Sequence, residues 1–520
     1  MSTRSLIKST GIISLATAAS RVLGFIRDIL MAYFFGTGGA IQAFFVAFRI
    51  PNLLRHMVAE GAANSAFVPV LSEYLVTRKR DEYWHLANVL FNKMLGLLLV
   101  VVIIGVLVSP IIVRIIAPGF LTDTGQFALT VNLTRILFPY ILLIGLAAYA
   151  MGVLNSLKHF WTPALAPALL NLSIIAAILI FRHDVSVTTL AWAILIGGFF
   201  QLFIQMPVLY KKGMRLKIGG RLSHVTAKKI GRLLIPRAIG ATVYQLNILI
   251  DTILASLHWI VGAGGIAALW YSNRLIQLPT AVFGISLATA ILPTLSGHFA
   301  KNDINSFKKT LNFSLKALFL IMIPATAGFI VLGSHIVRIL FQRGEFTAYS
   351  TMITSQALIF YSVGLFSYAG IKMLVFSFYS MQDTLTPVKT ASLALAMNVV
   401  LNLILMWPLK TGGLALATSI AGIFNFLALF YLLKRKIGRF YEEKLALFLI
   451  KVIAASALMG LILYLGSRRF DSILLTKGLP FNVSFMVISI AVGVVIYFAI
   501  LSLLRVRELG KFVKWVLRIQ

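Results

Sequence analysis

Long apolar runs alternate with short polar connections over almost the whole chain. An α-helix needs roughly 20 mainly apolar residues to cross the hydrocarbon core of a bilayer. The runs at 94–113 and 485–504 meet this requirement most clearly. Reading each run as one span predicts about fourteen transmembrane helices. Their centres lie near residues 20, 55, 100, 143, 172, 200, 245, 284, 320, 365, 398, 424, 455 and 493.

The composition supports a membrane protein. Hydrophobic residues make up 59% of the 520 residues, charged residues make up 12%, and the mean hydropathy is +0.94. Soluble domains do not reach this balance, and no polar stretch is long enough to fold as a separate soluble domain. The chain has no cysteine, which excludes disulfides and thiolate chemistry.

The formal net charge is +32, and its distribution is more informative than its size. Basic residues cluster in the connections at 77–85, 211–221 and 434–444 and in the tail at 505–518. Cytoplasmic loops carry such an excess of Lys and Arg, beside anionic lipid. Because the basic connections mostly follow even-numbered helices, we predict that both termini are cytoplasmic. Nucleic-acid binding is not expected.

The chain resembles itself at a fixed spacing. The stretch WTPALAPALLNL is matched by LTPVKTASLALAMNVVLNL, and Pro163 and Pro387 are 224 positions (387 − 163) apart. Pro69 and Pro293 are also 224 residues (293 − 69) apart. Helices 1–6 and 7–12 are therefore predicted to be two copies of one unit. An even number of spans in each copy gives a parallel repeat, related by an axis along the membrane normal.

Four segments follow from this repeat. We predict an N-lobe at 1–212, a cytoplasmic amphipathic linker helix at 213–234 and a C-lobe at 235–440, with helices 13 and 14 and a basic cytoplasmic tail at 441–520. The predicted fold class is an all-α integral membrane protein, in which two pseudo-symmetric six-helix lobes surround a central cavity. Such lobes suit transport by alternating access.

Several charged residues lie inside the predicted spans. A charge at the centre of a lipid-facing helix costs about 2.5–3.5 kcal/mol, so four arginines would cost on the order of 10–14 kcal/mol. These residues are therefore expected to face a wet or paired interior. They are Arg21, Arg27 and Asp28 on helix 1, Arg49 and Arg55 on helix 2, Arg237 and Asp251 on helix 7, and Arg274 on helix 8.

Acidic partners are too few for these arginines. We expect Asp28 to pair with Arg21, seven residues away on the same helix face, and Glu60 is a second candidate partner. Because a guanidinium matches the geometry of phosphate and carboxylate, the surplus of positive charge predicts a cavity for an anionic, phosphorylated substrate. The alternative is that arginines near helix ends, such as Arg49, reach the interface or bond helix-end carbonyls.

The stretch FRIPNLLR at 48–55 contains a further expected feature of helix 2. Proline lacks an N–H group, so we expect the helix to break at Pro51 and to leave backbone groups that need polar partners. Asn52 is a candidate for one of these partners. We therefore assign a gating or supporting role to Arg49, Asn52 and Glu60.

A sparser polar group is predicted in the second lobe. Its members are Asp251 on helix 7, Asn398 and Asn402 on one face of helix 11, and Thr418 on helix 12. Hard cations such as sodium take oxygen ligands, so a monovalent cation site is one prediction. Hydrogen bonding between helices by the Asn and Thr side chains is the alternative.

Signals for enzymatic chemistry are weak. The 8 histidines form no HExxH motif, and no glycine-rich loop ends in Gly-Lys-Ser or Gly-Lys-Thr. These are the spacings that zinc hydrolysis and nucleotide binding use. The sequence therefore favours a transporter with no bound cofactor over an enzyme or an ATP-driven pump.

Four stretches carry a resemblance to a known family: SRVLGFIRD (20–28), AFFVAFRIPNLLRHMVAEGAANSAFVPVLSEY (43–74), FPYILLIGLAAYAMGVLNSLKHFWTPALAPALLN (138–171) and FYSMQDTLTPVK (378–389). They resemble the MurJ/MviN family of lipid II flippases, in the multidrug/oligosaccharidyl-lipid/polysaccharide exporter superfamily. The resemblance covers nearly the whole chain. It implies a bundle in the bacterial inner membrane that moves undecaprenyl-pyrophosphate-linked peptidoglycan precursor to the periplasmic leaflet, for cell-wall biogenesis.

The resemblance also assigns roles to residues. The family's essential arginines, which the resemblance implies hold the pyrophosphate, fall on Arg21, Arg27, Arg55 and Arg274, with Asp28 beside Arg27. The sequence departs from the family pattern where relatives carry acidic residues, at Gln42, Asn273 and Gln277. A role for those carboxylates in gating or coupling is therefore not implied here.

The resemblance implies that lipid II and the bilayer are partners, with the cell-wall synthesis machinery as a further candidate. Either the membrane potential or a sodium ion near Asp251 is expected to reset the cycle. The nearest alternative is a flippase for another polyprenyl-linked oligosaccharide, of the O-antigen type. A drug exporter for cations would need an acidic cavity. A membrane enzyme acting on lipid-linked sugars would need outward-facing carboxylates or histidines, of which the chain has few.

Overall fold

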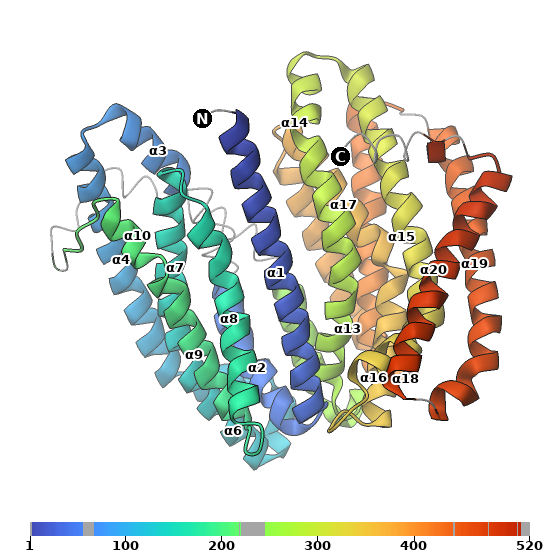
Figure 1. Cartoon of the computed structure of the whole chain (residues 1–520), viewed down its shortest axis with the longest axis horizontal. Helices are drawn as coiled ribbons and strands as arrows, with labels where there is room; N and C mark the ends of the chain where they lie inside the picture. Colours follow the sequence, from blue (N-terminus) through green and yellow to red (C-terminus); the bar gives the residue numbers. More distant parts are fainter. Residues whose placement is uncertain are drawn as a thin grey trace. The chain divides into compact units, whose positions relative to one another are not determined.

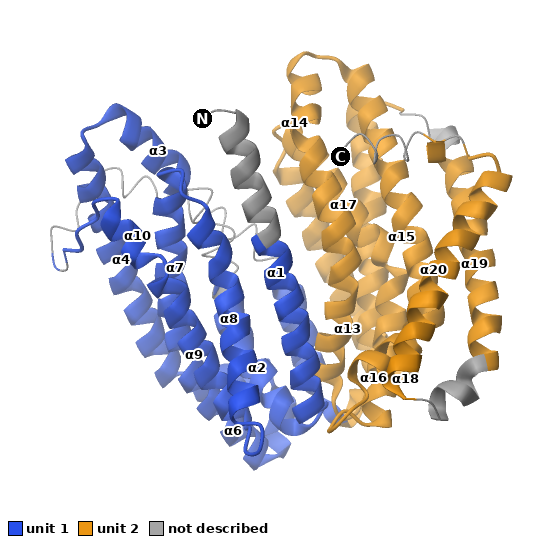
Figure 2. Cartoon of the chain, in the orientation of Figure 1, with its two compact units in different colours: residues 1–258 blue, residues 259–520 orange. Residues whose placement is uncertain are grey.

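The structure is a computed structural model that describes residues 3–55, 67–217, 219, 245–439, 442–476, 478–506 and 508–510, without the side chains at 3–15, 54, 442–444 and 470–476. Every regular element in the described ranges is a helix, as the apolar runs predict. The helices form two compact units, residues 1–258 and 259–520 (Figure 1, Figure 2).

Unit 1 begins with a long helix that ends at a glycine. Gly36 follows this helix with a φ of 54° and donates its N–H to the carbonyl of Ala32, as glycine C-caps do. The helices of the unit are α1 (Thr3–Phe35), α2 (Gly39–Arg55), α3 (Val68–Thr77), α4 (Arg80–Leu107), α5 (Ser109–Ile116), η2 (Pro118–Thr122), α6 (Thr124–Leu137), α7 (Pro139–Ser156), α8 (Trp161–Ile180), α9 (Val187–Phe203), α10 (Met206–Lys211) and a helix described over Gln245–Ala255.

Unit 2 contains longer helices, several of which start at side-chain caps. Asp303 accepts a hydrogen bond from the backbone of Ser306, and Thr347 accepts one from the backbone of Ser350, which satisfies free N–H groups at helix starts. The elements are α12 (His258–Val261, at the boundary), α13 (Gly265–Pro279), the π-helical turn η3 (Thr280–Ile285), α14 (Ser286–Ala300), α15 (Ile304–Phe341), α16 (Ala348–Val363), α17 (Leu365–Ser380), α18 (Leu385–Ile437), α19 (Glu442–Thr476) and α20 (Leu479–Leu503).

Many of these helices qualify as membrane spans. Among the described residues, 9 helices are long and apolar enough to cross a membrane, or 10 if α16 and α17, bent by 45°, count as one span. The other four predicted spans fall on α1, on α2 with α3, on the helix Gln245–Ala255 and on the second half of α18. The chain is therefore a multi-pass membrane protein.

The long element α18 is a hairpin of two helices rather than one rod. A straight helix of 53 residues would be about 80 Å long, yet Lys436 near its end lies 2.7 Å from Asp383 just before its start. The reversal is at Lys410, with φ 51° and ψ −133°. This geometry confirms the separate helices that the sequence predicts near residues 398 and 424. We call residues 385–437 the α18 hairpin.

The internal repeat is visible in the packing of each unit. In unit 1, α2 packs on α6 and α4 packs on α7. In unit 2, the repeat-matched helices make the same pairs, since α13 packs on α16 and α15 packs on α17. The pseudo-symmetry predicted from the spacing of prolines is therefore supported by how the helices pair.

The two compact units meet at residue 258, whereas the predicted lobes meet at the linker before residue 235. The helix Gln245–Ala255 belongs to the compact unit that ends at residue 258, although the repeat placed it in the second lobe. Residues 214–217 are not helical, and Lys217 donates its N–H to Asn88 of α4. The first described residues of the predicted linker helix are therefore not helical. The rest of that predicted helix, at 218 and 220–234, lies outside the described residues.

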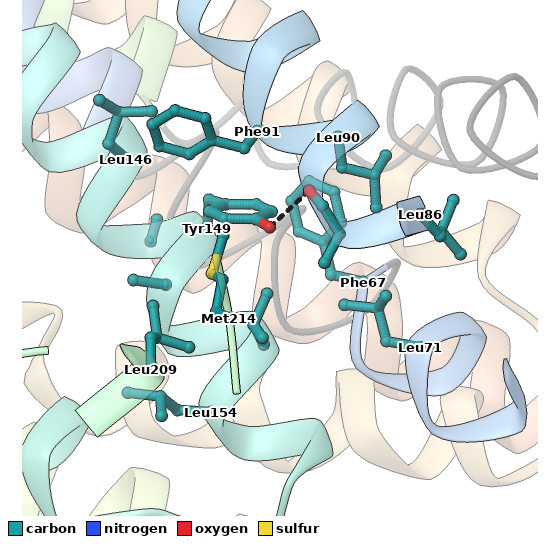
Figure 3. Close-up of a cluster of buried hydrophobic side chains, with 14 of the residues drawn as sticks. Phe67, Leu71, Leu86, Leu90, Phe91, Leu146, Tyr149, Leu154, Leu209 and Met214 are labelled. Atoms are coloured by element: carbon teal, nitrogen blue, oxygen red, sulfur yellow. Dashed lines mark hydrogen bonds between the residues drawn. The ribbon is translucent and has the colours of Figure 1, made fainter. Parts of the chain in front are cut away.

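An aromatic cluster holds α4 and α7 together in unit 1 (Figure 3). Tyr149 is fully buried and donates its hydroxyl hydrogen to the carbonyl of Ala87 at 2.6 Å. The rings of Phe67 and Phe91 lie edge-on to Tyr149, and the buried Met214 packs in the same cluster. The non-helical segment after α10 is thus anchored in this core.

Helices α19 and α20 lie outside the repeat and attach to α15. Pro324 in α15 has no N–H to donate to the carbonyl of Leu320. The hydroxyl of Tyr497 in α20 donates to that carbonyl at 2.9 Å instead. Lys316 of α15 also pairs with Glu508, beyond α20, at 2.5 Å. Polar contacts at the proline site and at Lys316 therefore attach the C-terminal helices to unit 2.

Candidate functional site

The charged motif of helix 1 lies where α1 packs along α8 in unit 1 (Figure 1). The side chain of Asp28 is 0% exposed and that of Arg27 is 12% exposed. Arg27 donates from Nη2 to Asp28 Oδ1 at 2.7 Å and from Nε to the same oxygen at 3.0 Å. A buried charge is tolerated when it is paired and hydrogen-bonded. This ion pair therefore explains two of the charges in helix 1.

Asn171 of α8 completes this group and was missed by the sequence analysis. Its Oδ1 accepts a hydrogen bond from Arg27 Nη1 at 3.1 Å, and its Nδ2 donates to the carbonyl of Ser20 at 3.0 Å. Asn171 is 8% exposed. The available signal was an amide within the apolar run of α8, at the end of a stretch that carries the family resemblance. We call Ser20, Arg27, Asp28 and Asn171 the α1–α8 contact.

The predicted pairing of Asp28 with Arg21 is wrong. Seven residues of helix separate their Cα atoms by about 10 Å along the axis, whereas the Arg27 side chain starts next to Asp28 and reaches it directly. Arg21 is exposed on unit 1. A ligand of unit 1 can therefore reach Arg21, whereas three nitrogens of Arg27 already bond within the protein.

The second group of arginines lies on α2. This helix continues through Pro51 to Arg55, so the predicted break at Pro51 is wrong. The packing of α2 on α6 and α7 holds the helix across the proline. Asn52, the residue after Pro51, accepts a hydrogen bond from Arg55 Nε at 3.1 Å. It therefore helps to hold the Arg55 side chain in place. Arg49 and Arg55 are half-buried. Glu60 lies outside the described residues, as does Arg237.

Arg274 lies on α13 in unit 2 and is half-buried. The two neutral residues that flank it bond each other, since Gln277 Nε2 donates to Asn273 Oδ1 at 2.5 Å. Gln42 on α2, the third neutral replacement, is 8% exposed. The π-helical turn η3 begins six residues after Arg274, and such turns are frequent at functional sites.

Lys372 is a further cation that the sequence analysis missed. It lies in the middle of α17, where the flanking residues are apolar, and its side chain is exposed on unit 2. A lysine at mid-span carries the same insertion cost as the arginines, so it should face a wet or protein-lined surface. The sequence could have indicated this cation, because Lys372 is the only charged residue in the run LFSYAGIKMLVFSFYS.

The predicted cation ligands come from both units, and each unit is described by itself. Asn398 donates from Nδ2 to Thr418 Oγ1 at 3.2 Å, across the two halves of the α18 hairpin, and accepts from Asn402 Nδ2 at 2.9 Å within the first half. Asp251 accepts from Asn247 Nδ2 at 3.3 Å and belongs to the other unit. The bond between Asn398 and Thr418 is therefore an interhelical hydrogen bond of the kind expected in the alternative interpretation. A cation there would need their amide oxygens to turn toward it.

Comparison with known sequences places this chain in a family. The family profile "Lipid II flippase MurJ" matches residues 31–485. A probable lipid II flippase MurJ from Buchnera aphidicola is 35% identical over 469 residues, covering 88% of this chain and 90% of the relative. A lipid II flippase MurJ from Burkholderia cenocepacia is 36% identical over 452 residues, covering 86% and 87%.

Solved structures agree with the sequence comparison. A lipid II flippase MurJ in an inward closed conformation matches with a TM-score of 0.81 and 28% identity, covering 96% of this chain and 99% of that one. An inward-facing multidrug resistance MATE family transporter of the MOP superfamily has a TM-score of 0.64 at 16% identity, covering 80% and 94%. The latter likeness concerns the fold alone. By its profile match and its identity to these relatives, the chain belongs to the lipid II flippase MurJ family.

Proposed function

We propose that this chain moves lipid II, the undecaprenyl-pyrophosphate-linked peptidoglycan precursor, from the cytoplasmic to the periplasmic leaflet of the bacterial inner membrane. Family membership, at 35% identity over 88% of the chain, is the observation that carries this proposal. The arginines inside the spans agree with it, because an anionic headgroup needs cationic partners in a medium where charge is costly.

In this proposal the pyrophosphate binds in a central cavity, with Arg21, Arg55 and Arg274 as direct ligands. Arg27 has five N–H donors. Its Nε and Nη2 each use one N–H on Asp28, and its Nη1 uses one on Asn171. The second N–H of Nη1 and that of Nη2 then remain for the pyrophosphate. The lobes then alternate between inward-open and outward-open states, while the polyprenyl tail stays in lipid beside α19 and α20.

The energy source is proposed to be the membrane potential or a monovalent cation. Asp251, Asn398, Asn402 and Thr418 supply the oxygen atoms that a sodium ion takes. Transport in proteoliposomes should then depend on sodium in place of potassium, or on an imposed potential. If neither changes the rate, this part of the proposal is wrong.

The basic connections support a topology with both termini in the cytoplasm. We propose a transporter that makes and breaks no covalent bond of lipid II, and that works beside the cell-wall synthesis machinery. Purified protein incubated with lipid II should release neither pyrophosphate nor glycan polymer. Release of either product would instead favour a membrane enzyme.

The main test is access of lipid II to an outer-leaflet probe in cells depleted of their own flippase. This chain should restore access, and Arg21→Ala, Arg55→Ala and Arg274→Ala should abolish it at normal membrane levels. If wild type restores no access, the substrate is another polyprenyl-linked oligosaccharide, such as an O-antigen unit. If the alanine variants work normally, the arginines do not bind the headgroup.

A further inference from the structure

We infer that Asn171 is a positioning residue for the arginines of α1. The inference deepens the proposed function and rests on it, because it concerns the side chains that hold an anionic headgroup. Asn171 contacts two points of α1, the carbonyl of Ser20 and the guanidinium of Arg27. Ser20 is the first residue of the motif SRVLGFIRD, and Arg27 is its second-last residue.

The chemistry of the amide explains why asparagine suits this place. Its Nδ2 donates and its Oδ1 accepts, so one side chain serves a carbonyl and a guanidinium at the same time. Ser20 lies within α1, where a carbonyl that takes an intrahelical bond still has a second lone pair. The amide is 8% exposed, and a polar group buried in an apolar helix is costly unless its hydrogen bonds are made.

The spacing of the two contacts gives them their effect. Ser20 and Arg27 are seven residues apart, which is about two helical turns. One hydrogen bond would leave α1 able to rotate about a single contact. The two bonds of the Asn171 amide instead hold a backbone carbonyl of α1 and the end of a side chain that starts about 10 Å further along its axis, which limits both the rotation and the axial position of α1 on α8. Arg21 follows Ser20 directly, so Asn171 sets the place of its backbone. Asn171 thus influences the headgroup ligands by holding α1 in place.

Binding of fluorescent lipid II to the full chain in nanodiscs tests this inference. Asn171→Leu keeps the side-chain volume and removes both hydrogen bonds, one of which is to a charged group. We expect the Kd to rise about tenfold, the factor that corresponds to the low end of a charged hydrogen bond. Ser173→Ala is the matched control on α8, since Ser173 bonds only the carbonyl of Leu169 in its own helix. Its Kd should stay at the wild-type value.

A double variant distinguishes positioning from a general loss of fold. Because Asn171 acts partly through Arg27, Asn171→Leu combined with Arg27→Gln should weaken binding of lipid II by less than the product of the two single losses. Losses that multiply would overturn the inference. So would an Asn171→Leu variant that binds as tightly as wild type.

A spectroscopic test works without any ligand. The chain has no cysteine, so a single spin label at Ala19→Cys, an exposed position on α1, reports on that helix alone. We expect a more mobile spectrum in Asn171→Leu and an unchanged one in Ser173→Ala. If wild type binds no lipid II, the proposed function fails, and this spectrum still decides the role of Asn171. An unchanged spectrum in Asn171→Leu overturns it.

Discussion

The α1–α8 contact and the α18 hairpin both use asparagine to join two helices, but only the first contains charge. In unit 1, Asn171 bonds Arg27, which is paired with the fully buried Asp28. In unit 2, Asn398 bonds Asn402 and Thr418, all neutral. The free energy at stake differs accordingly, because removing one member of a buried ion pair leaves a charge, whereas removing a neutral partner leaves a dipole.

The repeat makes this comparison sharper. Asp28 corresponds to Asp251 at a separation of 223 (251 − 28), but at that separation Arg27 corresponds to Ile250. The first copy therefore carries its own cation beside the carboxylate, and the second copy has an apolar residue there.

The largest effect should come from Asp28→Asn. The substitution keeps the shape and removes the charge that Arg27 faces, and breaking a buried ion pair in this way costs about 3–5 kcal/mol. We expect a large fall in the unfolding temperature of the full chain in nanodiscs, measured by tryptophan fluorescence. Adding Arg27→Gln should restore most of the stability. An Asp28→Asn variant as stable as wild type would mean that other groups compensate Arg27.

A second, smaller effect should come from the tight part of the α18 hairpin. A Cβ at Gly413 would lie 2.1 Å from the backbone oxygen of Leu405, which cannot move without opening the hairpin. We expect Gly413→Ala to lower the free energy of unfolding by about 1–3 kcal/mol. The matched control is Gly96→Ala in α4, where a Cβ would meet nothing within 4 Å. Alanine should be neutral or stabilising there, and equal effects would contradict the close approach.

The neutral network itself should be worth less than the charged one. Thr418→Val removes a hydroxyl group that accepts a hydrogen bond from Asn398 and donates one to the carbonyl of Leu414. Interhelical hydrogen bonds in membranes average about 0.6 kcal/mol and reach about 1.7 kcal/mol. We expect a loss in this range, against the much larger loss for Asp28→Asn. A loss of similar size at both sites would mean that the hairpin network also compensates a charge.

Much of the fold was predictable because it depends on local rules. The apolar runs located the helices, including the two spans centred near 398 and 424, between which the chain reverses at Lys410. The break expected at Pro51 was wrong because packing against α6 and α7 overrides the local cost of proline. The site was only partly predictable because it, too, depends on contacts between distant parts of the chain. The chemistry of Arg27 and Asp28 could be read from the motif, but their partner Asn171 lies 144 residues away from Arg27.

The smallest effect should come from the open end of the α18 hairpin, where Lys436, in the last turn of α18, pairs with Asp383 in the connection before the candidate span at 385–437. Burial acts to raise the pKa of Asp383, but hydrogen bonds from Lys436 and Thr386 outweigh it and lower the pKa to about 2. A carboxyl with a lowered pKa adds stability above its usual pKa of 3.8 and loses that contribution as the pH falls through about 2. The Lys436 side chain is 42% exposed, so Lys436→Met should cost less than about 1 kcal/mol at neutral pH. In unfolding measured between pH 5 and pH 2, the difference between this variant and wild type should shrink as the pH falls. A difference that stays constant would show that Lys436 stabilises the hairpin through its alkyl chain and not through its charge.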